Sequence, residues 1–238
     1  MMEIADLLLK ARNEKRGSLL YPEAKELLDA CGIRTAPSKI ARSREEAVQS
    51  ALSIGYPVVM KILSADLTHK SDVGGVFTGL SRPEEVVAAY ERIEENSRIA
   101  KPTIRMDGVI VEKTLSGVEA IIGVTRDAQF GSVLMVGMGG IFVDLLKDIS
   151  FRLIPIEPAD ALEMIHELRG FPVLEGYRGQ KGDIESLASL LLKVSHLIVQ
   201  YPDVALMDLN PVFVSSSGSI AGDVRIQLGN LPSRHIAS

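Results

Sequence analysis

The sequence has no tryptophan and few other aromatic residues, with 5 tyrosines and 6 phenylalanines in 238 residues. We therefore exclude proteins that hold single-stranded nucleic acid or sugars on an aromatic platform. The chain also has a single cysteine, Cys31, so an internal disulfide framework is excluded. Because free cysteines are commonly buried, we expect Cys31 to be a small core residue on the apolar face of a helix.

A basic stripe and a long apolar run are both missing. The 26 basic residues are interspersed among 31 acidic ones, for a net charge of -5, which argues against nucleic acid as a partner. No run of about 18 apolar residues occurs, so no transmembrane helix is predicted. The first residues, MMEIADLLLKARNEK, carry charges within their apolar stretch and lack the pattern of a signal peptide. We therefore expect a cytoplasmic protein with no membrane partner.

Helix and strand signals alternate in the first part of the chain. A helix is predicted from Pro22 to Gly32, and a second one opens at Ser43, where Glu46 has the spacing of a capping box. The apolar run 57–63 predicts a strand, 76–80 a return strand, and the stretch from Ser81 onward a helix.

Strand signals then gather in the middle, at 108–114, 118–126, 132–137, 140–146 and 152–156, and predict an antiparallel sheet. Helices follow from Pro158 and over 184–200, and two strands over 204–214 and 219–228. This order favours an α+β fold over a doubly wound parallel sheet. No dinucleotide-binding or P-loop motif follows a strand, and the glycine-rich GMGG (137–140) between two strands is weak evidence by itself.

Lys61 interrupts an apolar strand, and a buried ammonium group needs an anionic partner such as a phosphate. The alternative is a lysine at the strand edge with its ammonium group in water. Gly74 and Gly75, after a long loop, offer backbone N–H groups to a polyphosphate without side-chain obstruction, or they form a flexible turn.

Oxygen-bearing side chains mark the last two predicted strands. Asp208 and Asn210 are two residues apart and therefore point to the same face, and a hairpin can bring Asp223 opposite them. Such oxygen ligands suit Mg²⁺ with a bridging phosphate, whereas the alternative is an exposed polar face.

A third element is VIVEKTLSGVE (109–119), a strand that ends in Glu-Lys-Thr-Leu, with Glu119 seven positions after Glu112. The chain thus carries a strand lysine, a glycine loop, this Glu-Lys-Thr-Leu segment and an Asp-Leu-Asn motif, in that order. Together these four features resemble the ATP-grasp fold. Several segments narrow the resemblance to the β (ATP-grasp) subunit of ADP-forming acyl-CoA synthetases, the archaeal acetate–CoA ligase family, among them YPEAKELLDACGI, GYPVVMKILSADLTHKSDVGGV, RGFPVLEGYRGQKGD, MDLNPV and AGDVRI. The resemblance covers essentially the whole chain, and the succinyl-CoA synthetase β subunit is more distantly similar.

The resemblance implies two α+β subdomains that grip ATP or ADP. It divides the chain into an N-terminal helical extension (1–19), a first subdomain (20–106) and a second one (107–238), with the hinge at 112–115. The residues that it implies for the nucleotide are Lys61 and Gly74–Gly75 at the phosphates, Glu112 and the main chain of Lys113, Thr114 and Leu115 at adenine, and Glu119 at the ribose. Asn210 and Asp223 would bind Mg²⁺, with Asp208 as a further ligand or as a neighbour of the ligands.

The resemblance also gives His69 a role as a phosphohistidine. In such enzymes acyl-CoA, ADP and phosphate yield carboxylate, ATP and CoA, and a separate α subunit holds CoA and the acyl group. An α-subunit histidine would pass the phosphoryl group to His69, which would pass it to ADP, because an imidazole nitrogen is nucleophilic near pH 7. The implied partner is therefore the α subunit, in an α2β2 assembly, and acetate is the expected acyl group.

Two other functions remain open at this stage. Related domains serve as nucleotide-sensing regulatory modules without ligase activity, although these tend to lack the phosphohistidine. A stand-alone ATP-grasp carboxylate–amine ligase would turn over ATP with an amine and no partner subunit.

Overall fold

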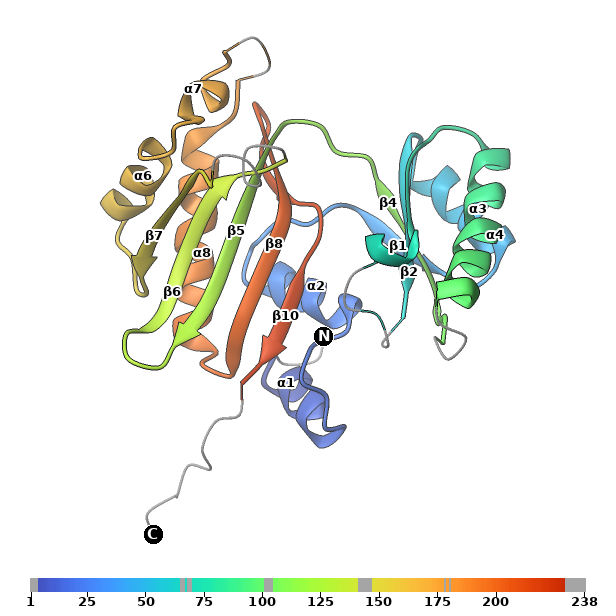
Figure 1. The fold of residues 1–238 in the computed structure, drawn as a ribbon, viewed down its shortest axis with the longest axis horizontal. Coiled ribbons are helices and arrows are strands. Elements are labelled where there is room, and N and C mark those ends of the chain that lie inside the picture. The colour runs from blue at the N-terminus through green and yellow to red at the C-terminus, as the bar shows by residue number, and fades with distance from the viewer. Residues whose placement is uncertain are drawn as a thin grey trace. The chain divides into compact units, whose positions relative to one another are not determined.

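The structure is a computed structural model that describes residues 4–64, 67, 70–100, 105–140, 147–177, 179 and 181–229. It consists of two compact units: unit 1 comprises residues 1–35 and 116–238, and unit 2 comprises residues 36–115 (Figure 1). The chain therefore begins in unit 1, forms unit 2 and returns to unit 1. In the described part of the chain, no helix is both long enough and apolar enough to cross a membrane.

Unit 2 is a four-stranded antiparallel sheet with two helices packed on one of its faces. The strands lie in the order β1-β4-β2-β3. The elements are β1 (Ser38–Ala41), α3 (Arg44–Ile54), β2 (Val58–Leu63), the 3-10 helix η1 (Ser71–Val73), β3 (Val76–Leu80), α4 (Pro83–Ala100) and β4 (Gly108–Lys113). The predicted strand and return strand over 57–80 are confirmed as the antiparallel pair β2 and β3.

The two faces of this sheet differ because side chains alternate along each strand. In β2, Val58, Met60 and Ile62 belong to an apolar core that includes residues of α3 and α4. Lys61 lies between two of these residues and therefore points to the opposite face. Glu112 of β4 is on that face too, since its neighbour Val111 belongs to the core.

Helix α3 is held at both ends by side chains. The hydroxyl of Ser43 accepts the N–H of Glu46 (3.1 Å), as the predicted capping box requires. The Glu46 carboxylate, however, accepts the N–H of Arg42 (2.7 Å) rather than that of Ser43. At the other end, the Lys113 ammonium group donates to the carbonyl of Gly55 (2.8 Å) and to that of the next residue (3.0 Å). A cation is favourable there because carbonyl groups at a helix C-terminus lack intrahelical donors.

Unit 1 is built on a larger antiparallel sheet with the strand order β10-β8-β5-β6-β7, and β9 pairs with β8. Its strands are β5 (Val118–Asp127), β6 (Gly131–Met138), β7 (Ile149–Leu153), β8 (Val204–Ser215), β9 (Gly218–Ala221) and β10 (Arg225–Leu228). Its helices are α1 (Ile4–Asn13), α2 (Tyr21–Ala30), α6 (Pro158–His166), α7 (Phe171–Leu174) and α8 (Ile184–Gln200). The predicted antiparallel pairing is confirmed for β5, β6 and β7, but the predicted strand 108–114 is β4 and belongs to the sheet of unit 2 instead. Strand β7 begins three residues before the predicted strand 152–156, and residues 141–146 of another predicted strand lie outside the described residues.

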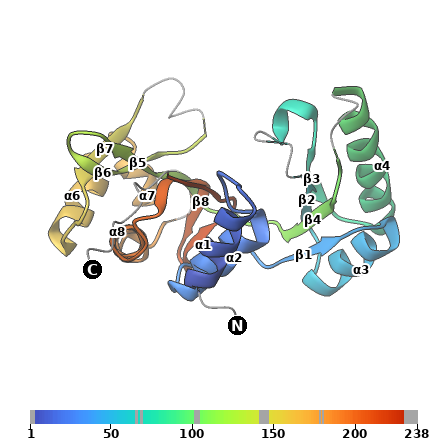
Figure 2. The same cartoon turned by 90° about the horizontal axis from the view of Figure 1, so that it is seen from below.

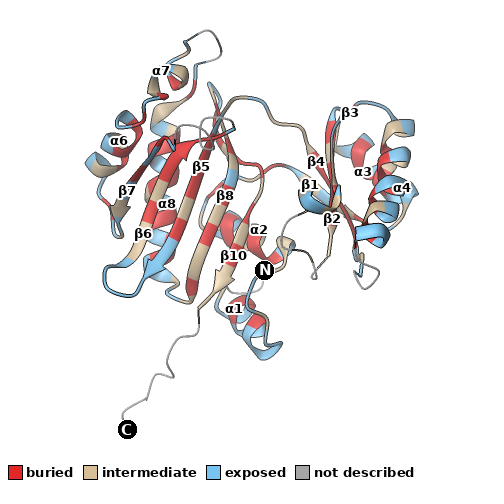
Figure 3. Ribbon diagram, viewed as in Figure 1, coloured by how far each residue is buried: buried red, intermediate tan, exposed pale blue. Residues whose placement is uncertain are grey.

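The helices of unit 1 pack on one face of this sheet. Apolar residues of α1, α2, α6 and α8 share one core with alternate strand residues, such as Ala120, Ile122 and Val124 of β5. Seen from below, α6 and α8 lie on the same side of the sheet (Figure 2), and buried stretches alternate with more exposed ones along β5 and β8 (Figure 3). Residues on the other face of the sheet do not belong to this core. On β7, that face carries the exposed side chains of Phe151 and Leu153.

Helix α2 follows the predicted pattern at its start but not at its end. It begins at Tyr21 with a proline in its first turn and ends at Ala30, so Cys31 lies just past the helix. Cys31 is half-buried against the core of unit 1 rather than fully enclosed. Burial nevertheless raises the pKa of its thiol.

The units divide the chain at other places than the predicted subdomains 1–19, 20–106 and 107–238. Helix α2 contributes Ala24, Leu27 and Leu28 to the core of unit 1, so residues before 36 belong there. Strand β4 pairs with β1 and β2, which places residues 107–115 in unit 2. The α+β fold is confirmed, whereas these boundaries depend on strand pairing between residues far apart in the sequence.

The chain crosses between the units twice, and both crossings are anchored in unit 1 on neighbouring strands. Before the first crossing, the carbonyl of Arg34 accepts the N–H of Ala221 in β9 (2.9 Å). After the second crossing, Val118 at the start of β5 pairs with Val214 of β8. Strands β8 and β9 are hydrogen-bonded to each other. The two points where the chain leaves and re-enters unit 1 are therefore both bonded to this one pair of strands.

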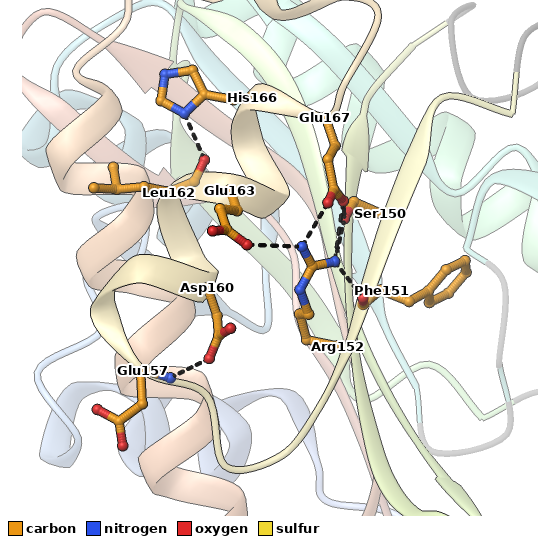
Figure 4. Close-up of polar contacts among 9 residues, drawn as sticks. All are labelled: Ser150, Phe151, Arg152, Glu157, Asp160, Leu162, Glu163, His166 and Glu167. Atoms are coloured by element: carbon orange, nitrogen blue, oxygen red, sulfur yellow. Dashed lines mark hydrogen bonds and ion pairs between the residues drawn. The ribbon is translucent and has the colours of Figure 1, made fainter.

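A polar network ties β7 to the end of α6 (Figure 4). The Arg152 guanidinium donates to both carboxylate oxygens of Glu167 (2.6 and 3.1 Å), and Ser150 donates its hydroxyl to the same carboxylate. Glu163 is a more distant partner of Arg152, at 3.5 Å. These hydrogen bonds, that from Arg152 first and that from Ser150 second, lower the pKa of Glu167 from 4.5 to about 2.

Removing the cap of α3 should destabilise unit 2. We expect Ser43→Ala to lower the free energy of unfolding by about 1 kcal/mol, because the N–H of Glu46 loses its acceptor. Urea unfolding measures this loss. Ser53→Ala is the matched control: its hydroxyl only bonds back to the carbonyl of Ser50 within the same helix, so alanine should not destabilise there. Equal effects of the two changes would contradict the cap.

The Arg152 network should be visible in a pH titration of the Glu167 carboxylate by NMR. We expect an apparent pKa near the lowered value of about 2 in the wild type, and a higher value in Arg152→Gln. Because the folded pKa is depressed, this interaction stabilises the protein above pH 4.5, and the contribution is lost as the pH falls from 4.5 towards 2. Ser150→Ala should raise the pKa less, and a wild-type value near 4.5 would contradict the network.

Candidate functional site

The predicted site residues are distributed over both units. Unit 2 holds Lys61, Gly74–Gly75 and Glu112–Leu115, and unit 1 holds Glu119, Asp208, Asn210 and Asp223. His69 lies outside the residues that the structure describes.

Lys61 and Glu112 form an ion pair on the helix-free face of the sheet in unit 2. The Lys61 Nζ lies 2.6 Å from Glu112 Oε2, and the side chains are only 10% and 2% exposed. Val59, not Lys61, is directly opposite Glu112, so the pair joins β2 and β4 diagonally. The alternative of a lysine at the strand edge with its ammonium group in water is wrong, because the ammonium group is buried beside a carboxylate.

The hinge residues that follow Glu112 are fixed by main-chain hydrogen bonds. Lys113 N–H donates to the carbonyl of Pro37 (2.9 Å), and Thr114 N–H donates to that of Pro57 (3.2 Å). These two donors are engaged within unit 2, which leaves the N–H of Leu115 as the hinge donor best suited to a ligand. The Thr114 hydroxyl is buried and has no hydrogen-bond partner among the described residues, so a ligand or water is expected to satisfy it.

The glycine pair is packed rather than free. Gly75 donates its N–H to the carbonyl of Lys70 (2.9 Å) and accepts from the N–H of Ile62 (2.8 Å). Gly74 has a φ of +60°, which favours glycine, and its carbonyl accepts from the Asn96 amide (3.0 Å). The expected flexible turn is therefore a closed one at this point. A phosphate contact through Gly75 N–H requires that its bond to Lys70 opens.

In unit 1, Glu119 lies near the start of β5 and is exposed on the helix-free face of the sheet. It pairs in register with Phe213 of β8, and Gly123, four residues further along β5, pairs with Asp208. At about 3.4 Å per residue, Glu119 and Gly123 are roughly 14 Å apart along β5, and Asp208 lies on β8 opposite Gly123. With this spacing, Glu119 and Asp208 can contact two different chemical groups of one extended ligand.

Asp208 and Asn210 share the same helix-free face, as the two-residue spacing predicts. Met207 and Leu209, the residues before each of them, are buried in the core on the other face. Asn210 is exposed and Asp208 is half-buried. Their carboxylate and amide oxygens therefore face away from the helices of unit 1.

Asp223 lies in the connection between β9 and β10, beside the same stretch of β8. Gly222 N–H donates to the carbonyl of Pro211 (2.8 Å), and Arg225 pairs in register with Asp208. These two contacts bracket Asp223 and hold it next to the residues between Asp208 and Pro211. The structure thus brings the three predicted Mg²⁺ ligands to one region of unit 1, and metal binding by them stays a prediction.

Two further features of this region carried no signal strong enough to assign from sequence. Arg225, directly opposite Asp208, brings a positive charge to the same face. The GMGG turn (137–140) lies against Glu119, because Gly139 N–H donates to the carbonyl of Glu119 (2.7 Å). Within the described ranges, no three side chains of His, Cys, Asp or Glu gather as a metal site. The predicted magnesium site would therefore also need the amide oxygen of Asn210 and phosphate oxygens of the nucleotide.

Removal of the Glu112 charge should destabilise unit 2 strongly. We expect Glu112→Gln to lower the free energy of unfolding by about 3 kcal/mol, because the buried Lys61 ammonium group loses its counter-charge. Denaturant unfolding measures the loss, and Lys61→Met combined with Glu112→Leu should restore most of it.

The matched control is Glu91→Gln, since Glu91 forms an ion pair of the same 2.6 Å length with Arg44 in unit 2, but both side chains are half-exposed. We expect that change to cost less than about 1 kcal/mol. A Glu112→Gln variant as stable as the Glu91→Gln variant would contradict a strong buried pair.

Comparisons with known proteins identify the family of the chain. The ATP-grasp domain family matches residues 10–228. The β subunit of acetate–CoA ligase [ADP-forming] I from Pyrococcus furiosus is 46% identical over 225 residues, which are 94% of this chain and 97% of that one. The acetate–CoA ligase [ADP-forming] I of Archaeoglobus fulgidus is 44% identical over 95% of this chain, which spans only 33% of that longer protein.

Solved structures of acetyl-coenzyme A synthetase 1 from Ca. Korarchaeum cryptofilum are similar over nearly the whole chain. One, in complex with coenzyme A and Ca-AMPCP, has a TM-score of 0.90 at 43% identity and covers 94% of this chain and 99% of its own. Another, with coenzyme A and Mg-AMPPCP, has its phosphohistidine segment pointing towards the nucleotide binding site (TM-score 0.82, 41% identity, 95% of this chain and 100% of its own). The chain described here therefore belongs to the ATP-grasp family and, within it, to the β subunits of ADP-forming acetate–CoA ligases.

Proposed function

We propose that this chain binds ADP or ATP and passes a phosphoryl group between ADP and a histidine of a partner α subunit. The complete reaction converts acyl-CoA, ADP and phosphate to carboxylate, ATP and CoA, with acetate as the expected acyl product. The observation that carries the proposal is the placement of polar site residues on the helix-free face of each sheet: the Lys61–Glu112 ion pair in unit 2, and the carboxylates of Glu119 and Asp208 with the amide of Asn210 in unit 1.

By similarity to the ATP-grasp family, each of the predicted residues would contact a different part of the nucleotide. Lys61 would contact the phosphates, exchanging part of its pairing with Glu112 for a phosphate oxygen, since a buried ammonium group needs an anionic partner in either state. The main chain at Leu115, with Glu112, would hold adenine. Glu119 would accept the ribose hydroxyl groups, because an exposed carboxylate is a strong acceptor for paired donors.

Asp208, Asn210 and Asp223 fit a magnesium ion, because each offers an oxygen ligand and they lie along one stretch of unit 1. When bound, the ion would neutralise charge on the phosphate oxygens that the transferred group carries. Arg225, opposite Asp208, would add positive charge on the same face.

His69 would carry the phosphoryl group over the distance between the partner's site and ADP. A neutral imidazole nitrogen attacks phosphorus, and the resulting phosphoramidate is energetic enough to phosphorylate ADP. The phosphohistidine segment that points towards the nucleotide in the Korarchaeum enzyme supports this role by similarity. Lys70 and Gly75, whose main-chain bond closes the described end of the loop, would form its base.

A partner chain would supply the CoA and acyl sites. The Archaeoglobus enzyme supports this, because the stretch similar to this chain is one third of a single longer protein. By itself, the present chain should therefore bind nucleotide but synthesise no acyl-CoA.

Phosphorylation of the purified chain tests the histidine. With Mg²⁺ and ATP labelled in the γ-phosphate, we expect an acid-labile label that His69→Asn abolishes and that the control His196→Asn, at an exposed position of α8, retains. The same assay is repeated with the partner subunit added.

Absence of label in both assays, with nucleotide still bound, would contradict the phosphoryl transfer and favour a nucleotide-sensing module. Turnover of ATP with an amine acceptor and no partner would instead favour a stand-alone ligase.

A further inference from the structure

Gly139 and Gly140, which follow the end of β6, lie against Glu119 of β5. The last register pair of β5 and β6 is Ala120 with Met138. One residue further on, Gly139 N–H donates to the carbonyl of Glu119 (2.7 Å). The turn therefore extends the ladder to the residue that the proposed function places at the ribose.

This contact leaves no room for a side chain at position 139. A Cβ atom added to Gly139 would lie 2.8 Å from the Cβ of Glu119 and 3.0 Å from its carbonyl carbon and oxygen. These are not the far ends of a flexible side chain, so the strand position itself would have to shift. Gly140 has a φ of +62°, and a Cβ there would lie 3.6 Å from Glu119 Oε2, so the carboxylate lies over the turn.

The turn is fixed on its other side as well. Met138 N–H donates to the carbonyl of Asp148 (3.1 Å). The buried carboxylate of Asp148 in turn accepts the N–H groups of Arg169 and Gly170, both at 2.7 Å. Because main-chain bonds hold it from both sides, the turn can act as a rigid support for Glu119.

We propose that Gly139 is a positioning residue that sets the Glu119 carboxylate for the ribose, so that the GMGG turn gives the site its preference for a nucleotide with both ribose hydroxyls. The inference rests on the proposed function of Glu119. A hydrogen bond between a hydroxyl and a carboxylate needs a distance of about 2.5–2.7 Å, so a small displacement of Glu119 weakens it.

The test compares Mg-ADP with Mg-2′,3′-dideoxy-ADP, measured by calorimetry on the full chain. We expect the wild type to prefer ADP by at least about 10-fold, because dideoxy-ADP lacks both hydroxyl groups and a single hydrogen bond to a charged group already accounts for about 10-fold. Gly139→Ala should bind ADP about 10-fold more weakly and dideoxy-ADP almost unchanged, so that the preference disappears. Gly17→Ala is the matched control, because a Cβ there meets nothing within 4 Å and the preference should remain.

Glu119→Gln separates failure of this inference from failure of the proposed function. A Glu119→Gln variant that keeps the preference for ADP would overturn the ribose role of Glu119. If Glu119→Gln loses the preference but Gly139→Ala keeps it, or if Gly139→Ala weakens both ligands equally, the positioning role is overturned. Should Gly139→Ala fail to fold, Asp148→Asn loosens the same turn from its far side and is judged by the same comparison.

Discussion

Side chains alternate between the two faces of a β-strand, and in both units of this chain the helices share a core with only one face of the sheet. On the other face, charged and amide side chains can lie at regular positions without belonging to that core. Lys61 and Glu112 use that face in unit 2, and Glu119, Asp208 and Asn210 use it in unit 1. The face on which each candidate site residue lies therefore follows from the alternation of side chains along its strand.

This alternation is also why part of the site could be predicted from the sequence. The two-residue spacing of Asp208 and Asn210 predicts their common face. It does not predict the register shift between β5 and β8 that follows directly at Asn210 and Pro211. The ion-pair partner of Lys61 could not be predicted from the sequence, because Glu112 comes close to it only through the diagonal register between β2 and β4. The packing of Gly75 and the boundaries of the units likewise depend on contacts between distant residues, which periodicity does not encode.

Lys113, one of the predicted hinge residues, also makes structural hydrogen bonds. Its ammonium group holds the end of α3, while its N–H is bonded to the strand region at Pro37. The main chain that would contact adenine is thus set by a helix and a strand at once. Preorganisation of this kind reduces the ordering that a ligand must otherwise impose.

The positions of the chain ends in each unit bear on how this two-unit chain could evolve. In unit 1, the ends at Arg34 and Val118 meet one strand pair. In unit 2, the first and last strands, β1 and β4, are paired along their length, so its ends are neighbours too. Unit 2 has the form of an inserted module, whose adjacent termini let a whole domain be gained or exchanged within a loop of its host without interrupting the host sheet.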